Sequence, residues 1–360
     1  MRNLFLLTLD FPPRYGGVAR YLHELAVHFQ QEIFVVAPRE KGSEVFDASV
    51  PYPVEREELL SSWMYPRWIK IIFYLVKKKN QYQTVLVSHL LPIGTAAWIA
   101  SFFTKKSYII FLHGLDVALA ESSWMKRFFT RHILCSAKLV VTNSQSLCDE
   151  VKKKYHPKQM LVMYPCPSYL PPEEGTPISG RLVTVARLVE RKGHLRVLEA
   201  LALLRKQNRL ENIQYRIVGN GPMYDGVMHG IHNLGLEDIV SLEREANDEM
   251  VRKVYETTDL FVMPTIKDSV DREGFGLVYL EAAAYGIPSI ATDQPGVEEA
   301  VIDKKTGILI PDGDIETLAE TIFTLVKNRS GRMALGKAAR MRVREQFNLS
   351  PMCEKLRSFL

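Results

Sequence analysis

The chain of 360 residues has only four cysteines, and their spacing offers no metal site. Cys135, Cys148, Cys166 and Cys353 are scattered, and none belongs to a CxxC pair. Such a distribution argues against a disulfide framework or a zinc cluster and is typical of free thiols in a reducing compartment. We therefore expect a cytoplasmic protein.

The sequence also lacks a long apolar run. No stretch approaches the ~18 residues that a membrane-spanning helix needs. The apolar run at residues 4–9 is short and leads directly into Asp10-Phe11-Pro12-Pro13, without a small-residue cleavage site. We therefore expect a first β-strand here and not a signal peptide.

An excess of basic residues is confined to one half of the chain. Lys and Arg number 46 against 41 Asp and Glu, a net charge of +5. Residues 1–165 carry 21 basic and 13 acidic side chains, whereas the remaining residues carry 25 and 28. The length favours two domains. The basic half suggests that one of them faces an anionic partner, for which nucleic acid, anionic lipid and a phosphorylated acceptor are candidates.

What the sequence does contain is a regular alternation of strand and helix patterns. The predicted strands are residues 4–9, 33–37, 84–88, 108–112, 138–142, 181–185, 215–218, 240–242, 260–263, 289–291 and 307–310. This alternation predicts an α/β protein with parallel, doubly wound sheets. A proline-rich segment near 164–180 predicts the domain boundary, and the polar residues 42–60 predict a loop.

The most informative stretch is residues 264–288, which follow the strand pattern at 260–263. The pattern predicts a polar loop, a glycine-containing turn and a helix over 277–284. A helix start offers unpaired N–H groups and the positive end of the helix dipole. Gly274 and Gly276 let a ligand approach the backbone closely. Together these features predict a phosphate-binding site.

Two glutamates flank this predicted phosphate site. Glu273 precedes the helix, and Glu281 lies inside it. Carboxylates do not bind phosphate, so we expect them to accept hydrogen bonds from hydroxyl groups on either side of it. A ligand with hydroxyls on both sides of a diphosphate is a nucleotide-sugar. The alternative, an ordinary helix with surface glutamates, stays open on these residues alone.

Fixed charges near the end of strand 181–185 suit the same ligand. Arg187 and Lys192 lie on a strand-to-helix loop, where a guanidinium fork and an ammonium point charge would bind a diphosphate leaving group. Solvated loop charges are the alternative, and we expect Arg191 to be solvated.

Residues 312–314 have an Asp-Gly-Asp spacing that chelates a metal in some enzymes. Asp314 directly precedes a helical pattern, and we expect it to cap that helix. Because the basic side chains and the helix start already supply positive charge, no metal and no cofactor is expected.

The first half has two further strand-end candidates. Gly16-Gly17, at a strand-to-helix turn, permits phosphate approach, although it is not a GxGxxG fingerprint and a simple tight turn is the alternative. His113 follows strand 108–112, and the carboxyl ends of parallel strands are where such sheets place ligands. A structural histidine is the alternative there.

Residues 63–79 and 124–133 mix tryptophan and other aromatic residues with clustered lysine and arginine. This composition suits helices lying on an anionic membrane surface. Ordinary helices packing on the sheet are the alternative. The basic half lacks interleaved RNA-binding motifs, so we expect no nucleic-acid partner.

Six motifs follow one another along the chain. They are GGVAR (16–20), HGLD (113–116), ARLVERKGH (186–194), VGNGP (218–222), EGFGLVYLE (273–281) and GILIPDGD (307–314). Together they resemble the retaining glycosyltransferases of family 4, and the motifs around 11–17 and 271–282 most resemble the phosphatidylinositol mannosyltransferases. The resemblance implies the GT-B fold: two doubly wound Rossmann-like domains whose parallel sheets face each other across a cleft.

On this resemblance, residues 1–165 form an acceptor-binding domain, 166–178 a linker and 179–345 a nucleotide-sugar-binding domain. Residues 346–360 form a terminal helix that crosses back to the first domain. The acceptor is a lipid-linked or glycan molecule, with residues 42–62 as the main contributor to its site.

The resemblance also implies roles for single residues. The catalytic set is His113 beside the donor sugar, Arg187 and Lys192 on the leaving diphosphate, and Glu273 on the sugar hydroxyls. Glu281 would bind the ribose. The remaining donor-binding set is Gly16, Gly17, Gly219, Gly274, Phe275, Gly276, Leu277 and Val278. The family usually has a glycine near Glu243 or Arg244, so its base preference cannot be transferred to this chain.

The implied reaction is transfer of a hexose with retention, giving an α-linkage, with GDP-mannose slightly favoured as donor. A UDP-sugar fits the same residues, as in cell-envelope polysaccharide synthesis. A phosphorylase or sugar-nucleotide epimerase and a non-catalytic protein that binds nucleotide or RNA are alternatives from other classes. The expected location is the cytoplasm, with peripheral contact at the inner face of the membrane.

Overall fold

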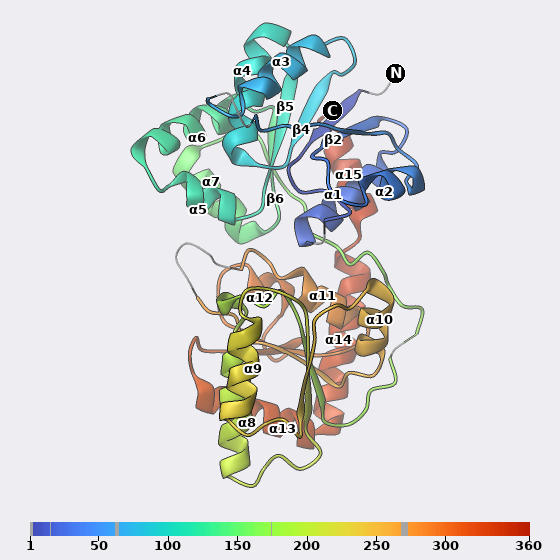
Figure 1. The fold of residues 1–360 in the computed structure, drawn as a ribbon, viewed down its shortest axis with the longest axis vertical. Coiled ribbons are helices and arrows are strands. Elements are labelled where there is room, and N and C mark those ends of the chain that lie inside the picture. Colours follow the sequence, from blue (N-terminus) through green and yellow to red (C-terminus); the bar gives the residue numbers. More distant parts are fainter. Residues whose placement is uncertain (1–2, 15, 62–64, 174, 268–272) are drawn as a thin grey trace. The chain divides into compact units, whose positions relative to one another are not determined.

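The structure, a computed structural model, describes residues 3–14, 16–61, 65–173, 175–267 and 273–360. It divides into two compact units, Met1–Ser168 with Asn348–Leu360, and Tyr169–Phe347 (Figure 1). The sequence predicted domain boundaries at residues 165 and 345 and a linker at 166–178. In the structure, residues 166–168 of that linker belong to the first unit and residues 169–178 to the second. Among the described residues, no helix is long and apolar enough to cross a membrane.

The first unit is built on a parallel sheet of seven strands in the order β3-β2-β1-β4-β5-β6-β7. Its strands are β1 (Leu4–Leu7), β2 (Ile33–Ala37), β3 (Val54–Arg56), β4 (Thr84–Val87), β5 (Ser107–Leu112), β6 (Leu139–Thr142) and β7 (Met160–Val162). Its helices are α1 (Gly17–His28), α2 (Ser43–Ser49), α3 (Ile69–Lys77), α4 (Thr95–Thr104), α5 (Leu115–Ala120), α6 (Trp124–Ser136), α7 (Gln145–Tyr155) and α15 (Leu349–Arg357), with the irregular turn η1 (Leu90–Gly94) before α4.

The second unit is built on a parallel sheet of six strands in the order β10-β9-β8-β11-β12-β13. Its strands are β8 (Arg181–Val185), β9 (Gln214–Val218), β10 (Val240–Glu243), β11 (Leu260–Met263), β12 (Ser289–Thr292) and β13 (Gly307–Ile310). Its helices are η2 (Glu190–Lys192), α8 (His194–Lys206), α9 (Tyr224–Asn233), α10 (Asp248–Glu256), α11 (Leu277–Ala284), α12 (Val297–Ala300), α13 (Ile315–Lys327) and α14 (Arg329–Gln346).

The central strands are buried along their whole length. Every residue of β1, β4 and β11 is buried, because helices cover both faces of each sheet. In the second unit, α8 and α9 lie on one face and α11 and α14 on the other (Figure 1). This placement follows from right-handed crossovers that run in opposite directions from β8 and from β11. The predicted pair of doubly wound parallel sheets is confirmed.

The prediction of a loop over residues 42–60 is wrong. This segment contains α2 and β3, and Val54 of β3 pairs with Val35 of β2 in parallel register. β3 is only three residues long and lies at the sheet edge. Neither element has the periodic apolar pattern that would predict it from sequence. β3 is a strand because it pairs with β2, and not because its residues favour strands.

The terminal helix α15 packs against α1 of the first unit. Arg357 of α15 pairs with Glu32 and lies over the ring of Phe29. The last residues of the chain therefore belong to the unit that also holds the first ones.

In the second unit, α14 approaches the end of α11 very closely. A Cβ added at Gly336 would lie 1.9 Å from the carbonyl oxygen of Gly286. Glycine at this position therefore permits the contact that holds α11, the helix predicted to bind phosphate, against α14.

We expect Gly336→Ala to destabilise the second unit, although alanine is the better helix former. The added Cβ would overlap the Gly286 carbonyl, and relieving such overpacking costs about 1–3 kcal/mol. Gly226→Ala in α9 is the matched control, because its Cβ would meet only the end of the Met223 side chain, at 3.3 Å. Thermal unfolding followed by circular dichroism should show a lower midpoint for Gly336→Ala only. Equal midpoints for the two variants would contradict the close packing of α14 on α11.

Candidate functional site

The candidate site of the second unit lies where its strand order reverses. β8 and β11 are neighbours in the sheet, but the chain leaves them in opposite directions. The loops at their carboxyl ends therefore separate and leave room for a ligand between them, as in other open α/β sheets. The predicted cations follow β8 and the predicted helix start follows β11, so the structure brings these two sets of residues to one place.

Direct contacts hold the two loops together. The N–H of Ile266, after β11, donates to the carbonyl of Arg191, after β8, at 2.8 Å. A Cβ at Gly193 would lie 2.0 Å from the Pro264 carbonyl, and its φ of +71° also favours glycine. Glycine is thus required here by the close approach of the two strand ends.

Glu273 lies between two cations at this position. Its Oε2 accepts a hydrogen bond from Lys192 Nζ at 2.5 Å and pairs with Arg191 Nη1. The Glu273 and Lys192 side chains are each only 10% exposed. Burial raises the pKa of the Glu273 carboxyl, but the charges of Lys192 and Arg191 outweigh burial and hold that pKa below its ordinary value.

The prediction of a solvated Arg191 is therefore wrong. Arg191 and Lys192 lie in the turn η2, which presents both side chains to the same carboxylate. The spacing of these residues in the sequence does not predict that both bind Glu273. Two adjacent side chains reach the same carboxylate only because the turn between β8 and α8 is tight. Arg187, by contrast, is exposed.

The helix start predicted at Leu277 is confirmed. Gly276 caps α11 in the left-handed region at φ +83°, where a Cβ would lie 2.5 Å from the Tyr279 ring. Tyr279 Oη donates to the carbonyl of Met263 at 2.7 Å, which fixes the first turn of α11 to the end of β11. The first-turn N–H groups of any helix lack intrahelical partners, so the segment from Gly276 to Val278 offers donors at a fixed place.

The other predicted donor-binding residues of this unit differ in their surroundings. Phe275 is 2% exposed, and its ring centroid lies 5.8 Å from that of Phe347, so only its backbone can face a ligand. Gly274 immediately precedes it. Gly219 follows β9, and its N–H donates to Glu243 O at 2.9 Å. Glu281, in α11, is half-buried, and its Oε2 lies 3.5 Å from Tyr255 Oη.

One functional candidate was missed by sequence analysis. His194 begins α8 and is buried, and its Nε2–H donates to the carbonyl of Arg187 at 3.1 Å. Burial lowers the pKa of His194 to about 4, so the ring is neutral at neutral pH. His194 therefore holds the backbone of the exposed Arg187. Its position directly after Gly193, at the start of α8, is the only local signal that the sequence offers for it.

Asp314 caps α13, as predicted. Its Oδ1 accepts from the Thr317 N–H at 2.9 Å, and Asp312 pairs with Arg196 at 2.6 Å. Both carboxylates of the Asp-Gly-Asp segment thus have structural partners. No group of three His, Cys, Asp or Glu side chains that could hold a metal occurs in the part of the chain that the structure describes.

The predicted residues of the first unit are Gly16, Gly17 and His113. Gly17 begins α1, Gly16 is extended, and no atom would lie within 4 Å of a Cβ at either. The unit itself therefore does not require glycine at these positions. His113 follows β5, and burial lowers its pKa to about 3, which keeps the imidazole neutral at neutral pH.

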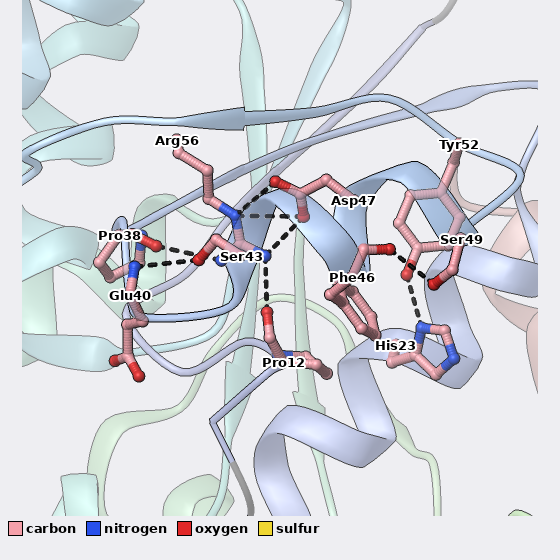
Figure 2. A network of polar contacts seen from close by, with 10 residues as sticks. All are labelled: Pro12, His23, Pro38, Glu40, Ser43, Phe46, Asp47, Ser49, Tyr52 and Arg56. Carbon is pink, nitrogen blue, oxygen red and sulfur yellow. Dashed lines mark hydrogen bonds and ion pairs between the residues drawn. The ribbon is translucent and has the colours of Figure 1, made fainter.

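A buried arginine holds the segment before this diglycine (Figure 2). Arg56 Nη2 donates to the Pro12 carbonyl at 2.6 Å, and its Nη1 donates to the Pro38 carbonyl at 3.0 Å. The same guanidinium binds Asp47 of α2 at 2.7 Å, and its side chain is 6% exposed. Residues 42–60, which were wrongly predicted to be a loop, thus contribute the arginine that holds the segment before Gly16 in place. Tyr15 lies outside the described residues, as do Asp271 and Arg272.

Comparison with known proteins gives consistent results for both units. Residues 15–167 match the family model "Glycosyltransferase Family 4", and residues 177–342 match "Glycosyl transferases group 1". The chain is 27% identical to a GDP-mannose-dependent alpha-(1-6)-phosphatidylinositol monomannoside mannosyltransferase of Mycobacterium tuberculosis, over 100% of this chain and 98% of that protein. A GDP-mannose-dependent enzyme of Corynebacterium glutamicum that acts on the monoacylated phosphatidylinositol monomannoside is 24% identical, with the same coverage.

Among solved structures, the fold is similar to that of HepE from Anabaena, which was solved in complex with UDP and glucose. The TM-score is 0.83 over 99% of both chains, at 18% identity. This likeness shows that the fold is GT-B.

We expect Glu273→Gln to lower the thermal stability of the second unit at pH 7. The substitution leaves two partly buried cations without their carboxylate, and breaking such a pair costs about 3 kcal/mol. Folding lowers the pKa of Glu273. The ion pairs of Glu273 therefore stabilise the fold fully above the unfolded pKa of about 4.3, and this stabilisation is lost as the pH falls through the lower, folded pKa. The midpoint difference between wild type and variant should therefore shrink between pH 7 and about pH 3.5.

Glu249→Gln is the matched control, because Glu249 pairs with Lys253 on the exposed face of α10. Exposed pairs contribute little, so the control should unfold like the wild type at both pH values. A Glu273→Gln midpoint that matches the control at pH 7 would contradict the described ion pairs.

Proposed function

The chain belongs to glycosyltransferase family 4 and has the GT-B fold, and we propose that it transfers a hexosyl group with retention from a nucleotide-diphosphosugar to a lipid-linked or glycan acceptor. One observation carries this proposal. The start of α11 and the Glu273–Lys192–Arg191 cluster meet at the strand-order reversal of the second sheet. This arrangement combines anion-binding N–H groups, fixed cations and a carboxylate for hydroxyl groups.

The main catalytic task in such a transfer is to stabilise the leaving diphosphate. As the glycosidic bond breaks, negative charge grows on the phosphate oxygens, and preorganised donors lower the barrier most at that point. We assign this role to Arg187, to Lys192 and to the N–H groups from Gly276 to Val278. Gly16 and Gly17 are the proposed phosphate-binding residues of the first unit, where nothing within that unit demands glycine.

The sugar and the ribose need hydroxyl-binding groups on either side of the diphosphate. Glu273 is ionised above its lowered pKa, so its carboxylate accepts hydrogen bonds from sugar hydroxyls while Lys192 and Arg191 hold it in place. Glu281, further along α11, would bind the ribose. His113 is neutral, so it can accept or donate a single hydrogen bond beside the sugar without adding charge.

The proposed step forms an α-linkage. The acceptor hydroxyl oxygen bonds to the anomeric carbon on the face from which the diphosphate departs, and the hydroxyl proton moves to an oxygen of that leaving group. No metal is required in this scheme, because Arg187, Lys192 and the helix start supply the positive charge.

GDP-mannose is the favoured donor, because the mannosyltransferase relatives match over the full length of the chain. A UDP-sugar, used in cell-envelope polysaccharide synthesis, is the second candidate. Its support is the fold likeness to HepE, which was solved with UDP and glucose.

We further propose that the first unit binds an anionic membrane from the cytoplasmic side. Large apolar side chains stand exposed on α4 and α6, with Trp124 75% and Phe103 65% exposed. These two helices pack against each other. We use the name aromatic–basic surface for exposed or half-exposed side chains of α4, of the turn after it and of α6, namely Phe102, Phe103, Trp124, Met125 and Phe128 with Lys105, Lys106, Lys126, Arg127 and Arg131.

Such a surface suits the headgroup region of a membrane. Its aromatic side chains can enter the interface, and its cations are attracted to anionic lipid. Residues 63 and 64 of the other predicted membrane segment, 63–79, lie outside the described residues, but α3 adds the exposed ring of Phe73.

Nucleotide binding can be tested by a thermal-shift titration with GDP, UDP and ADP. We expect GDP to stabilise the wild type, by about 2.7 kcal/mol at 100 times Kd. Glu281→Ala should abolish this shift because the ribose loses its partner, whereas Glu199→Ala, on the exposed face of α8, should retain it. A shift with UDP only would select the second candidate. No shift with any nucleotide would contradict the donor site and favour a non-catalytic protein.

Membrane binding can be tested by flotation with vesicles of phosphatidylcholine alone and with added phosphatidylglycerol. We expect flotation only with the anionic lipid, and less of it at high salt, because the attraction is screened. The double variant Trp124→Ala/Phe128→Ala should bind at least about tenfold more weakly, since each ring contributes about 1.5–3 kcal/mol when buried. Met228→Ala/Met341→Ala, which removes exposed side chains of the second unit, is the control. Flotation that is independent of lipid charge would contradict this part of the proposal.

A further inference from the structure

A second polar site lies where the strand order of the first sheet reverses. β1 and β4 are neighbours in the order β3-β2-β1-β4-β5-β6-β7, and the chain leaves them in opposite directions. Their register pairs Leu7 with Val87, which places Thr8 beside Ser88 just beyond the strands. Asp10 and His89 follow at the carboxyl edge, where an open α/β sheet binds ligands.

A continuous chain of hydrogen bonds connects these four residues. Thr8 Oγ1 donates to the Asp10 carbonyl at 2.9 Å, and Ser88 Oγ donates to Thr8 Oγ1 at 2.7 Å. His89 Nδ1 lies 2.6 Å from Ser88 Oγ, and His89 Nε2 lies 3.1 Å from Asp10 Oδ2. Each hydroxyl has one proton, and both are already used by the first two bonds.

The direction of the remaining two bonds follows from this count. Ser88 Oγ can only accept from His89 Nδ1–H, and an ionised Asp10 can only accept from His89 Nε2–H. Both ring nitrogens of His89 therefore face oxygen atoms of this network. The hydrogen bond from His89 is the largest influence on Asp10 and lowers its pKa. Burial raises the pKa of Asp10, but this hydrogen bond and the nearby His89 and Arg14 side chains lower it by more. The carboxylate is therefore ionised at neutral pH.

The buried part of this network supports an accessible part. Thr8 and Ser88 are fully buried, whereas the Asp10 side chain is 34% exposed. Arg14 Nη1 binds the second carboxylate oxygen of Asp10 at 3.1 Å. His113, at the end of the next strand β5, and Asp116 are the other titratable groups that act on this pair. The buried Nε2 of His113 has no hydrogen-bond partner among the described residues.

We propose that Asp10 binds a hydroxyl group of the acceptor and that His89 is its positioning residue. This inference rests on the proposed glycosyltransferase function. An ionised carboxylate repels phosphate and accepts from O–H groups, so the acceptor part that it contacts is a polyhydroxylated ring, either a sugar or a cyclitol headgroup. Arg14 can donate to a neighbouring ring oxygen. His89 holds the carboxylate in one orientation and in its charged form.

The test uses the full chain, the donor identified by the nucleotide titration, and two acceptor probes. One probe is vesicles that contain phosphatidylinositol, and the other is soluble methyl α-D-mannopyranoside. Transfer to vesicles alone would identify a lipid-linked ring, and transfer to the soluble glycoside a glycan. Hydrolysis of the donor without acceptor reports separately on the donor site and on folding.

We expect Asp10→Asn to raise the acceptor KM about tenfold or more, because a hydrogen bond to a charged group is lost. Donor hydrolysis and nucleotide stabilisation should change by less than about twofold, since this proposal assigns Asp10 to the acceptor and not to the donor. Asp149→Asn, an exposed carboxylate of α7, is the matched control and should leave all values unchanged.

A double variant separates positioning from a general structural role. His89→Gln alone should raise the acceptor KM, but it should add nothing in the Asp10→Asn background, because His89 acts only through Asp10. Additive effects of the two substitutions would overturn the positioning role.

An unchanged KM in Asp10→Asn, or an equal loss of donor hydrolysis, would overturn the acceptor assignment. Donor hydrolysis by the wild type without transfer to either probe would overturn the class of acceptor. A wild type that neither binds a nucleotide nor hydrolyses a donor would overturn the proposed function itself, together with this inference.

Discussion

The reversal of strand order within each parallel sheet is the constraint on which the rest of the structure depends. Right-handed crossovers that run outward from two neighbouring strands place their helices on opposite faces of the sheet. The loops at the carboxyl ends of those strands must then diverge. The first sheet has this arrangement at β1 and β4, and the second has it at β8 and β11. The Glu273 cluster and the Asp10 cluster lie just beyond these four strands.

Both reversals place a carboxylate between two basic side chains. Glu273 lies between Arg191 and Lys192, and Asp10 lies between Arg14 and His89. In each case the neighbouring charges and hydrogen bonds outweigh burial and keep the carboxylate ionised. The two differ in exposure, because the Glu273 side chain is 10% exposed and that of Asp10 is 34% exposed. A nearly closed carboxylate suits a fixed contact with one ligand, whereas a more open one suits a larger and more variable acceptor.

Much of the fold was predictable because the decisive signals are local. Apolar runs such as 260–263 are buried strands, the helix start at Leu277 follows from the glycine before it, and Asp314 caps α13 as its position predicts. The prediction of a loop for segment 42–60 failed because α2 and β3 have no periodic apolar face and depend on partners distant in sequence. Arg56, which joins Asp47, Pro38 and Pro12, became visible only when those elements were assembled.

The order of amino acids alone predicts the strand and helix alternation, the glycine-rich turn before α11, and the motifs that identify the family. Each depends on the chemistry of neighbouring residues, which the order of amino acids states directly. Which charges compensate each other depends instead on how the chain folds. Arg191 and Glu273 are 82 residues apart, and His89 and Asp10 are 79 apart. Electrostatic interactions and hydrogen bonds depend on distance in space, and the crossovers of the two sheets set that distance.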